Sequence, residues 1–307
     1  MHMADALLAP TVGLAFDAAS VGLVAAASRR VVREPGYERR APLMGVLGAF
    51  VFAAQLVNFA IPGTGSSGHL AGGLLLAVLV GPSAAFLVMV SVLMVQALVF
   101  GDGGLLALGC NVFNLGFWPS FVGIALYRQV SRAVPGPRGV TLGAVAASLV
   151  SLELGALGVV AQTALSGRLD LPLRDFAVLM VGIHAPIAVV EGLATAGIVQ
   201  MALRLAPERL DAVPAGGRQF STHVPLLLVF FGAALFLATV GLAWASALPD
   251  GLAWSLGTAS AALGQSRGWV NVDAPLAGPL GALLAGAVVV GASLMLSRLR
   301  RGNSPTS

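Results

Sequence analysis

The residues of this chain best suited to chemistry are histidines near its start. The sequence opens Met1-His2, so an α-amine, the first peptide nitrogen and an imidazole lie within two residues and can surround one metal ion. A second histidine, His69, follows in the Gly/Ser-rich stretch 61–69. Four nitrogens in one plane suit Ni(II) or Cu(II) and exclude the oxygen-preferring Mg(II) and Ca(II). The alternative interpretation of His2 is a surface histidine on a frayed terminus.

Polar residues in the outer halves of apolar stretches support a site beside these histidines. Amides within a bilayer are costly unless hydrogen-bonded, and contacts between helices are their ordinary explanation. We expect the side-chain amides in the outer halves of the spans to orient the imidazoles, and these are Gln55, Asn58, Gln96, Asn111 and Asn114. Asp5 and Ser67, beside the candidate ligands, are expected to do the same. Asp102, in the turn 101–104, is either a carboxylate at the mouth of the site or a plain turn residue.

Three further ionisable residues lie within apolar stretches: Glu153, His184 and Glu191. Such groups inside a membrane are functional candidates. His184 and Glu191 share one helix face, but the HExxH spacing of zinc hydrolases is absent, so an intramembrane metal-dependent hydrolase is a weak alternative. We expect a buried ion-paired network or a contact with a partner protein. Asp17, in the first predicted span, is a candidate for a proton pathway.

The composition identifies an integral membrane protein. Apolar residues make up 57% of the 307 residues and charged residues 10%, and the mean hydropathy is +0.91. Repeated apolar runs of helical length predict an all-α, polytopic helical bundle. The single cysteine, Cys110, excludes a disulfide framework and makes redox chemistry improbable. The arginines lie at helix ends without an aromatic-basic patch, so nucleic-acid binding is rejected.

Nine membrane crossings are predicted, seven in a main bundle and two in a C-terminal module. The predicted spans are 6–28, 41–60, 68–81, 83–100, 104–127, 140–165, 176–203, 223–246 and 276–297. With the N-terminus outside the cytoplasmic membrane and the C-terminus inside, fourteen of the seventeen arginines face the cytoplasm. A single helix over 68–100 would move Arg128, Arg132 and Arg138 outside, so two helices joined at Gly81-Pro82 are favoured.

The chain divides into three parts by composition. Residues 1–203 form the predicted metal-binding transmembrane domain, 204–222 a cytoplasmic linker, and 223–307 a two-helix auxiliary module with a long outer loop over 247–275. A chain without lysine cannot contain the GxxxxGK[ST] loop that holds ATP phosphates. The protein therefore uses a gradient, as a secondary metal carrier would, or depends on a partner ATPase.

Several segments resemble one family. The opening MHMADALLAP is similar to "MHIPDGFLSP", and Ile61-Pro62-Gly63-Thr64 with Ser67-Gly68-His69-Leu70 is similar to "IPGTSGHL". The run from Gln96 to Asn114 resembles "QALLFGDGGL…GANVFNMG". These motifs are typical of the substrate-binding component of nickel/cobalt energy-coupling-factor transporters, the CbiM/NikM family, and the resemblance covers about 1–203.

The resemblance implies a ligand set and partners. It implies metal binding by the amine of Met1, the amide and imidazole of His2, and the imidazole of His69. It also implies a transmembrane coupling protein and two cytoplasmic ATPases, so the chain is no enzyme itself. The loop carries an extra residue at Gly65 or Ser66, which bears on the reach of His69.

The C-terminal part carries a second resemblance. Residues 248–252, LPDGL, are similar to the "PDGLE" motif of the small auxiliary component, with Ala253 in place of Glu. Such a fusion favours nickel over cobalt as the transported ion, and no resident cofactor is implied.

Overall fold

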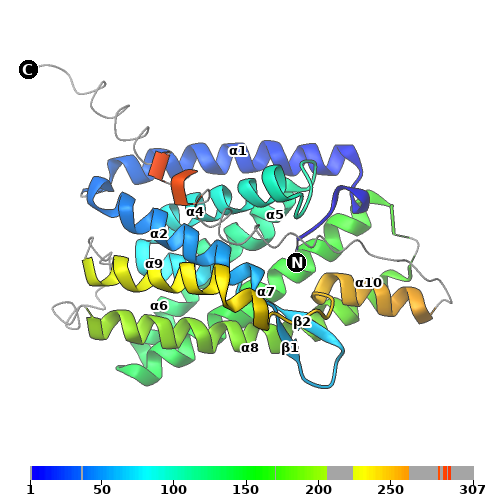
Figure 1. The fold of residues 1–307 in the computed structure, drawn as a ribbon. Helices are drawn as coiled ribbons and strands as arrows, with labels where there is room; N and C mark the ends of the chain where they lie inside the picture. The colour runs from blue at the N-terminus through cyan, green and yellow to red at the C-terminus, as the bar shows by residue number, and fades with distance from the viewer. Residues whose placement is uncertain are drawn as a thin grey trace, which may run out of the picture.

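The structure, a computed structural model, describes residues 2–35, 37–169, 171–205 and 224–262, together with 283, 286–288, 290 and 291. Long helices packed side by side dominate this part of the chain (Figure 1). They are α1 (Pro10–Arg33), α2 (Tyr37–Leu56), α4 (Pro82–Val95), α7 (Pro137–Ser166), α8 (Leu173–Leu205) and α9 (Val224–Thr239). The predicted all-α membrane bundle is confirmed, with one small hairpin added.

Shorter elements connect or extend these helices. They are η1 (Asp5–Leu7), β1 (Phe59–Ile61), β2 (Ser66–Gly68), α3 (Gly73–Val80), η2 (Gln96–Phe100), α5 (Leu108–Asn111), η3 (Val112–Gly123), α6 (Ile124–Ala133), η5 (Gly241–Trp244) and α10 (Gly251–Ala262). Three of them, α5, η3 and α6, join into one apolar helix over Leu108–Ala133. Its middle part is π-helical and contains Pro119, which lacks the N–H that a regular α-helix would use.

Five helices of the described part are long and apolar enough to cross a membrane, and Arg40–Leu56 and Val224–Thr239 are shorter apolar helices. Together they correspond to seven of the nine predicted spans. Of the predicted span 276–297 the structure describes residues 283, 286–288, 290 and 291, which are helical, and of the predicted linker 204–222 it describes only 204 and 205. The division into domains stays a prediction.

The break between α3 and α4 falls where the sequence predicts it. Gly81 has a φ of 86° and a ψ of 162°, a backbone conformation open essentially to glycine alone, and Pro82 then starts α4. The predicted helix 68–81 is too long, because α3 begins only at Gly73 and its eight residues span roughly 12 Å. Gly68 instead ends strand β2, and residues 69–72, including His69, are loop.

The core lies along α3 and α4, which are enclosed by the other helices. Phe86, Val88 and Met89 on α4 are fully buried, as are Leu75 and Leu76 on α3. The outer helices instead expose large apolar side chains. Examples are Leu14, Val178, Leu193, Leu228 and Leu235. An apolar exterior around a buried apolar centre is the pattern expected of a bundle surrounded by lipid.

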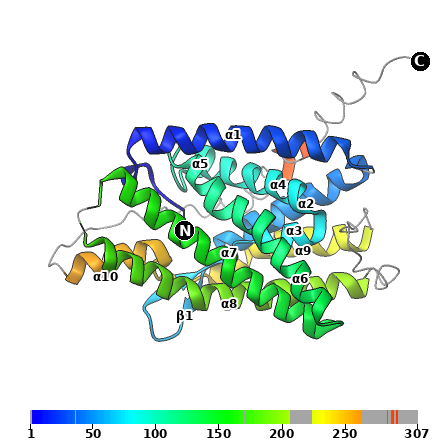
Figure 2. The same cartoon turned by 180° about the vertical axis from the view of Figure 1, so that it is seen from behind.

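The two ends of the bundle differ in their basic residues. At one end α1 and α6 finish with arginines, α8 finishes with Arg204, and Arg138 lies in the first turn of α7. Two described arginines, Arg168 after α7 and Arg174 at the start of α8, lie at the opposite ends of these helices. The other end holds the N-terminal segment, the hairpin and α10, as Figures 1 and 2 show from two sides. This segregation fits the predicted topology, in which His2 and His69 face the same side of the membrane.

Part of the predicted outer loop 247–275 is helical. Helix α10 covers Gly251–Ala262, packs along α8, and begins directly after the LPD sequence of 248–250. The predicted outer connection therefore contains a helix, which the carboxylate of Asp250 caps by accepting a hydrogen bond from the Ala253 amide at 2.8 Å.

Candidate metal centre

The segment that carries His2 is fixed by the residue that follows it. The N–H of Met3 donates to Asn111 Oδ1 at 2.7 Å, and Asn111 Nδ2 donates to the Met3 carbonyl at 3.1 Å. The side chain of Met3 is fully buried. A second hydrogen bond holds the same segment: Asp5 Oδ1 accepts from the amide of Ala107 at 2.9 Å. The backbone leading to His2 is therefore held against α5. Met1 lies outside the described residues.

The loop that carries His69 is held from two directions. The carboxylate of Glu191 on α8 accepts the amides of Ala71 and Gly72 at 2.7 and 2.8 Å. From α2, Gln55 Nε2 donates to the carbonyl of Ala71 at 2.8 Å, and Gln55 Oε1 accepts from Gln96 Nε2 at 2.6 Å. That Gln55 and Gln96 orient metal ligands stays a prediction. Glu191, expected in a buried ion-paired network or at a contact with a partner protein, accepts hydrogen bonds from backbone amides.

The extra residue in the loop does not carry His69 away from His2. Strands β1 and β2 pair antiparallel, from Phe59 opposite Gly68 to Ile61 opposite Ser66. The added length is taken up in the turn between them, where Gly63 and Gly65 both have a φ of 75°. Residue 69 directly follows the paired strand, so the turn at the far end of the hairpin does not displace it.

The two imidazoles lie side by side. Their ring centroids are 5.5 Å apart and their planes are inclined by 30°. An ion bound at about 2 Å by one nitrogen of each ring would separate the two centroids by at most about 6 Å. His2 Nε2 is buried and has no hydrogen-bond partner among the described residues. The spacing therefore admits one metal ion between the rings with little movement.

His69 is kept in the form that binds metal. Burial, and to a smaller extent nearby positive charge, lower the pKa of its imidazole to about 4. Its Nδ1 lies 3.3 Å from the carbonyl of Leu70. When Nδ1 carries the proton and donates to this carbonyl, Nε2 keeps the free lone pair. The ring is neutral near pH 7.

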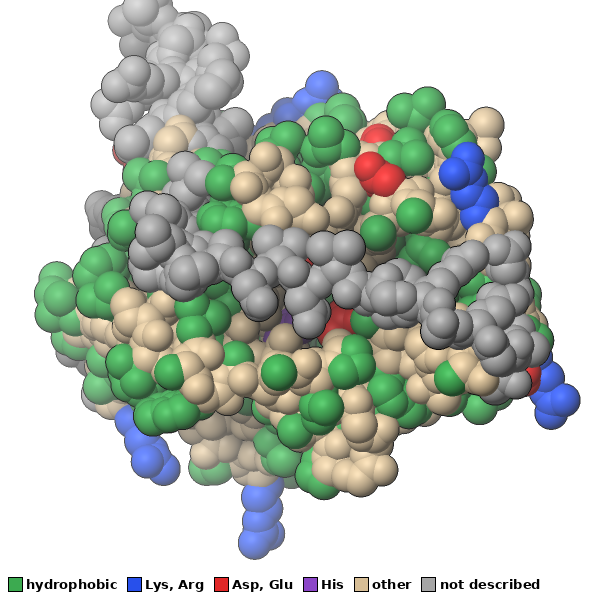
Figure 3. All heavy atoms as spheres, turned by 45° about the vertical axis from the view of Figure 1, so that its right-hand side comes forward, with side chains coloured by type: hydrophobic (Ala, Val, Ile, Leu, Met, Phe, Trp, Pro, Cys, Tyr) green, Lys and Arg blue, Asp and Glu red, His purple; other side chains and the backbone are tan. Residues whose placement is uncertain are grey.

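Both imidazoles open onto one cavity of about 460 Å³. Two carboxylates line it, Asp102 after η2 and Asp250 before α10, together with Gln55, Asn58 and Gln96. The described residues of the lining include no arginine, so their charge is suited to cations. Figure 3 shows histidine and acidic side chains together in a hollow of a face that is otherwise largely apolar or uncharged.

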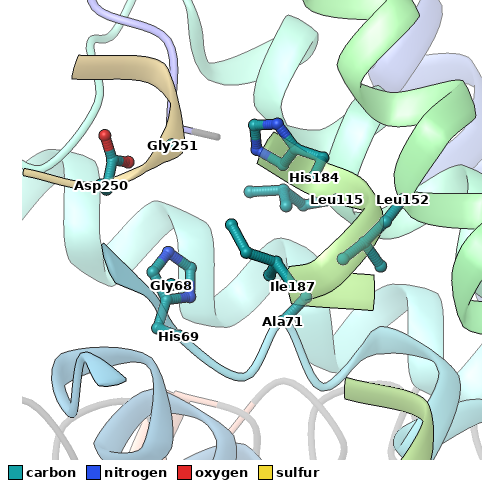
Figure 4. Close-up of a pocket in the computed structure, with 9 residues that line it drawn as sticks. All are labelled: Gly68, His69, Ala71, Leu115, Leu152, His184, Ile187, Asp250 and Gly251. Atoms are coloured by element: carbon teal, nitrogen blue, oxygen red, sulfur yellow. The ribbon is translucent and has the colours of Figure 1, made fainter. Parts of the chain in front are cut away.

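A second, smaller cavity of about 20 Å³ lies next to His69 and has room for about one water molecule. Figure 4 shows the side chains of His69, His184 and Asp250 around it, each from a different element. His184 on α8 is buried, and its Nδ1 lies 2.7 Å from the carbonyl of Met180. His184 is thus a neighbour of the candidate ligand.

The segment before α10 closes the site from the C-terminal part of the chain. Ser67 donates its N–H to the carbonyl of Pro249 at 2.8 Å and its hydroxyl to that of Leu248 at 2.7 Å. Trp254 Nε1 donates to the carbonyl of Thr64 at 2.9 Å. Sequence reasoning missed Asp250 as a residue of the site. The resemblance of 248–252 to a motif was the available signal.

The other predicted residues lie apart from the imidazoles or serve the packing. Asn114 pairs with Gln162 through two hydrogen bonds of 2.7 and 3.1 Å. Asp17 accepts the amide of Gly109 at 2.7 Å and so ties α1 to α5. Glu153 on α7 has two buried oxygens without a hydrogen-bond partner in the described part of the chain. No hydrogen bond there joins Glu153, His184 and Glu191, so the predicted common network is absent.

Comparison with known proteins places this geometry in context. Residues 2–209 match the family described as "Cobalt uptake substrate-specific transmembrane region", CbiM. The chain is 33% identical over 261 residues to the "Probable fused nickel transport protein LarMN" of Lactiplantibacillus plantarum, covering 82% of this chain and 79% of that one. It is 31% identical over 224 residues to "Cobalt transport protein CbiM" of Sorangium cellulosum, covering 69% and 95%.

A solved structure shares the fold. The crystal structure of a truncated transition metal transporter aligns with a TM-score of 0.59 and 30% identity, over 67% of this chain and 99% of that one. The fold and these relatives define a multi-pass membrane protein of metal transport rather than an enzyme. Within that class, the chain belongs to the CbiM family.

Proposed function

We propose that this chain is the substrate-binding component of an energy-coupling-factor transporter, and that it captures Ni(II), in preference to Co(II), from outside in a square-planar set of four nitrogens. The observation that carries the proposal is the pair of imidazoles, His2 and His69, 5.5 Å apart at one cavity. The ion is the transported substrate and leaves the site in each cycle.

The chemistry of the chain start supplies the remaining ligands. The amine of Met1, the first peptide nitrogen and the imidazole of His2 can close adjacent chelate rings around one ion, and His69 adds the fourth nitrogen. A deprotonated peptide nitrogen in a planar set suits Ni(II), and this donor type supports the preference over Co(II). The relative named as a fused nickel transport protein, which is similar over most of this chain, adds support.

Import by this chain requires energy from elsewhere. The sequence has no lysine and therefore no phosphate-binding loop of the GxxxxGK[ST] type. A transmembrane coupling protein and two cytoplasmic ATPases fill this role in the proposed assembly. They would drive the rearrangement that releases the ion to the inside of the cytoplasmic membrane.

Metal titration of the purified full chain tests the site. The affinity tag must be at the C-terminus and free of histidine, because an N-terminal tag would displace the amine and a polyhistidine tag would bind nickel. We expect His2→Ala, His69→Ala and a glycine inserted between Met1 and His2 each to weaken Ni(II) binding by at least 100-fold. Unchanged binding in all three would contradict the site. Titration of the unaltered chain with Co(II) tests the preference.

Liposomes distinguish the proposed transporter from a gradient-driven carrier. The chain reconstituted alone is expected to bind Ni(II) without active uptake. Uptake should appear only with the coupling protein, the ATPases and ATP. Accumulation driven by a proton gradient in the chain alone would favour the secondary carrier instead.

A further inference from the structure

A carboxylate from the C-terminal part of the chain reaches the candidate metal centre. Asp250 lines both the large cavity with His2 and the small one with His69 and His184. It lies 181 residues beyond His69 in the sequence. The hydrogen bonds from Ser67 to Leu248 and Pro249 hold the preceding residues against β2, and Ser67 and Asp250 form a parallel bridge.

The other side of this segment is also fixed. Gly251 packs against His184 so closely that a Cβ atom there would lie 2.9 Å from the imidazole Cε1. A larger residue would push the segment away from the small cavity. The position of Asp250 is thus set on one side by the hairpin and on the other by α8.

Electrostatics shows that Asp250 and the imidazoles act on each other. Burial alone would raise the pKa of the Asp250 carboxyl, but nearby positive charge, the hydrogen bond from Ala253 and the imidazole of His69 lower it well below its usual range.

A captured ion needs such a charge. Ni(II) bound by one deprotonated amide and three neutral nitrogens keeps a net positive charge, which is costly to hold away from water without a counter-charge. No three His, Cys, Asp or Glu side chains of the described residues are placed to hold a metal together. Asp250 is thus suited to balance the charge beside the ion rather than to complete a set of side-chain ligands.

We propose that Asp250 is the counter-charge of the captured ion, so that the C-terminal part of the chain contributes directly to metal retention. This inference rests on the proposed function. Asp250 is a positioning residue in this role: it acts on the ion through its charge and on the ligands through its contact with the loop of His69. The carboxylates that are the nearest neighbours of metal ligands typically change metal affinity 10- to 100-fold when replaced.

A purely structural role for Asp250 gives a different expectation. Its carboxylate also caps α10 through the Ala253 amide, and Asn and Ser cap helices about as well as Asp. Asp250→Asn and Asp250→Ser therefore retain a cap and remove the charge. If capping were its whole role, both variants would bind metal like the unaltered chain.

The test measures Ni(II) affinity by calorimetric titration of the full chain for both variants. Asp175→Asn is the matched control, because Asp175 is an exposed carboxylate in the first turn of α8 and lines neither cavity. We expect a 10- to 100-fold loss for both Asp250 variants, a change below about threefold for Asp175→Asn, and an unchanged melting temperature. A loss in Asp250→Asn that Asp250→Ser does not share would overturn the proposal, as would equal effects at Asp250 and Asp175.

A further arm separates this inference from the proposed function. If His69→Ala binds Ni(II) as tightly as the unaltered chain, the nitrogen site itself is wrong. If His69→Ala loses binding while both Asp250 variants keep it, the site stands and the counter-charge is wrong.

Discussion

The segment that carries His2 and the loop that carries His69 reach the same cavity but are held in different ways. Asn111 holds the first segment, with two hydrogen bonds to the backbone of Met3, one residue away from the ligand. The loop is held by Glu191 from α8, by Gln55 from α2 and, through Ser67, by the segment before α10. The segment of His2 is therefore held by Asn111 and, further along, by the contact of Asp5 with Ala107, whereas the loop of His69 is held from three distant parts of the fold.

Glu191→Ala would break the loop side of this comparison most strongly. It leaves the buried amides of Ala71 and Gly72 without their acceptor, and each such loss costs about 1–3 kcal/mol. We expect a markedly lower melting temperature and at least a tenfold loss of Ni(II) affinity. Glu191→Gln keeps one acceptor oxygen, so its melting temperature and Ni(II) affinity should lie between those of Glu191→Ala and the unaltered chain. Affinity equal to that of the unaltered chain in both variants would show that the loop does not need this anchor.

Asn111→Ala tests the other side. It removes both hydrogen bonds to Met3 and frees the segment that leads to His2. We expect roughly a tenfold loss of affinity, in the range found for residues that orient metal ligands. Gln162→Ala is the control, because Gln162 is a buried amide that pairs with Asn114 and has no hydrogen bond to Met3 in the described part of the chain. Comparable losses of Ni(II) affinity in both variants would mean that packing, and not the two hydrogen bonds between Asn111 and the Met3 backbone, controls the site.

The dependence of folding stability on pH should reveal the contribution of His69. Its folded-state pKa of about 4 lies below the unfolded value of 6.5, so the unfolded chain binds this proton first. The stability of the metal-free protein is then unaffected by this group above pH 6.5 and declines as the pH falls toward 4. His69→Gln should reduce that decline. Melting temperatures at pH 7.5, 6 and 5 measure this decline. An equal fall in melting temperature for His69→Gln and the unaltered chain would refute the prediction.

Gly81→Ala is expected to have the smallest effect on the site. The substitution forces a side chain into a backbone conformation that costs on the order of 1–3 kcal/mol, at the bend between α3 and α4. The melting temperature should fall while Ni(II) affinity changes less than about threefold. A large loss of affinity would show that the bend and the loop of His69 are coupled through α3.

The sequence predicted those parts of the site that stand out against an apolar background. Gln55 and Asn111 were identified because an amide in a membrane span needs a partner, and their partners proved to be backbone groups beside the ligands. Glu191 was singled out for the same reason. Its actual partners, Ala71 and Gly72, leave no trace in a sequence, because any residue except proline offers a backbone amide.

What the sequence could not predict depends on long-range docking. Helix α10 contains Gly251, Ser255 and Gly257, which are poor helix formers, and it forms with a cap from Asp250 and a packing surface on α8. Neither the surface nor the approach of Asp250 to His69 follows from local residue preferences. Apolar length located the long helices of the described residues, whereas 69–72, predicted as helix, is a loop held by hydrogen bonds from distant helices.

The hydrogen bonds between Ser67 and residues 248–249 have a consequence for assembly. Because both partners belong to one polypeptide, docking is an intramolecular event whose effective concentration is set by the intervening chain. The occupancy of this contact is then independent of the protein density in the membrane. The same segment supplied on a separate chain would close the site only at high local abundance.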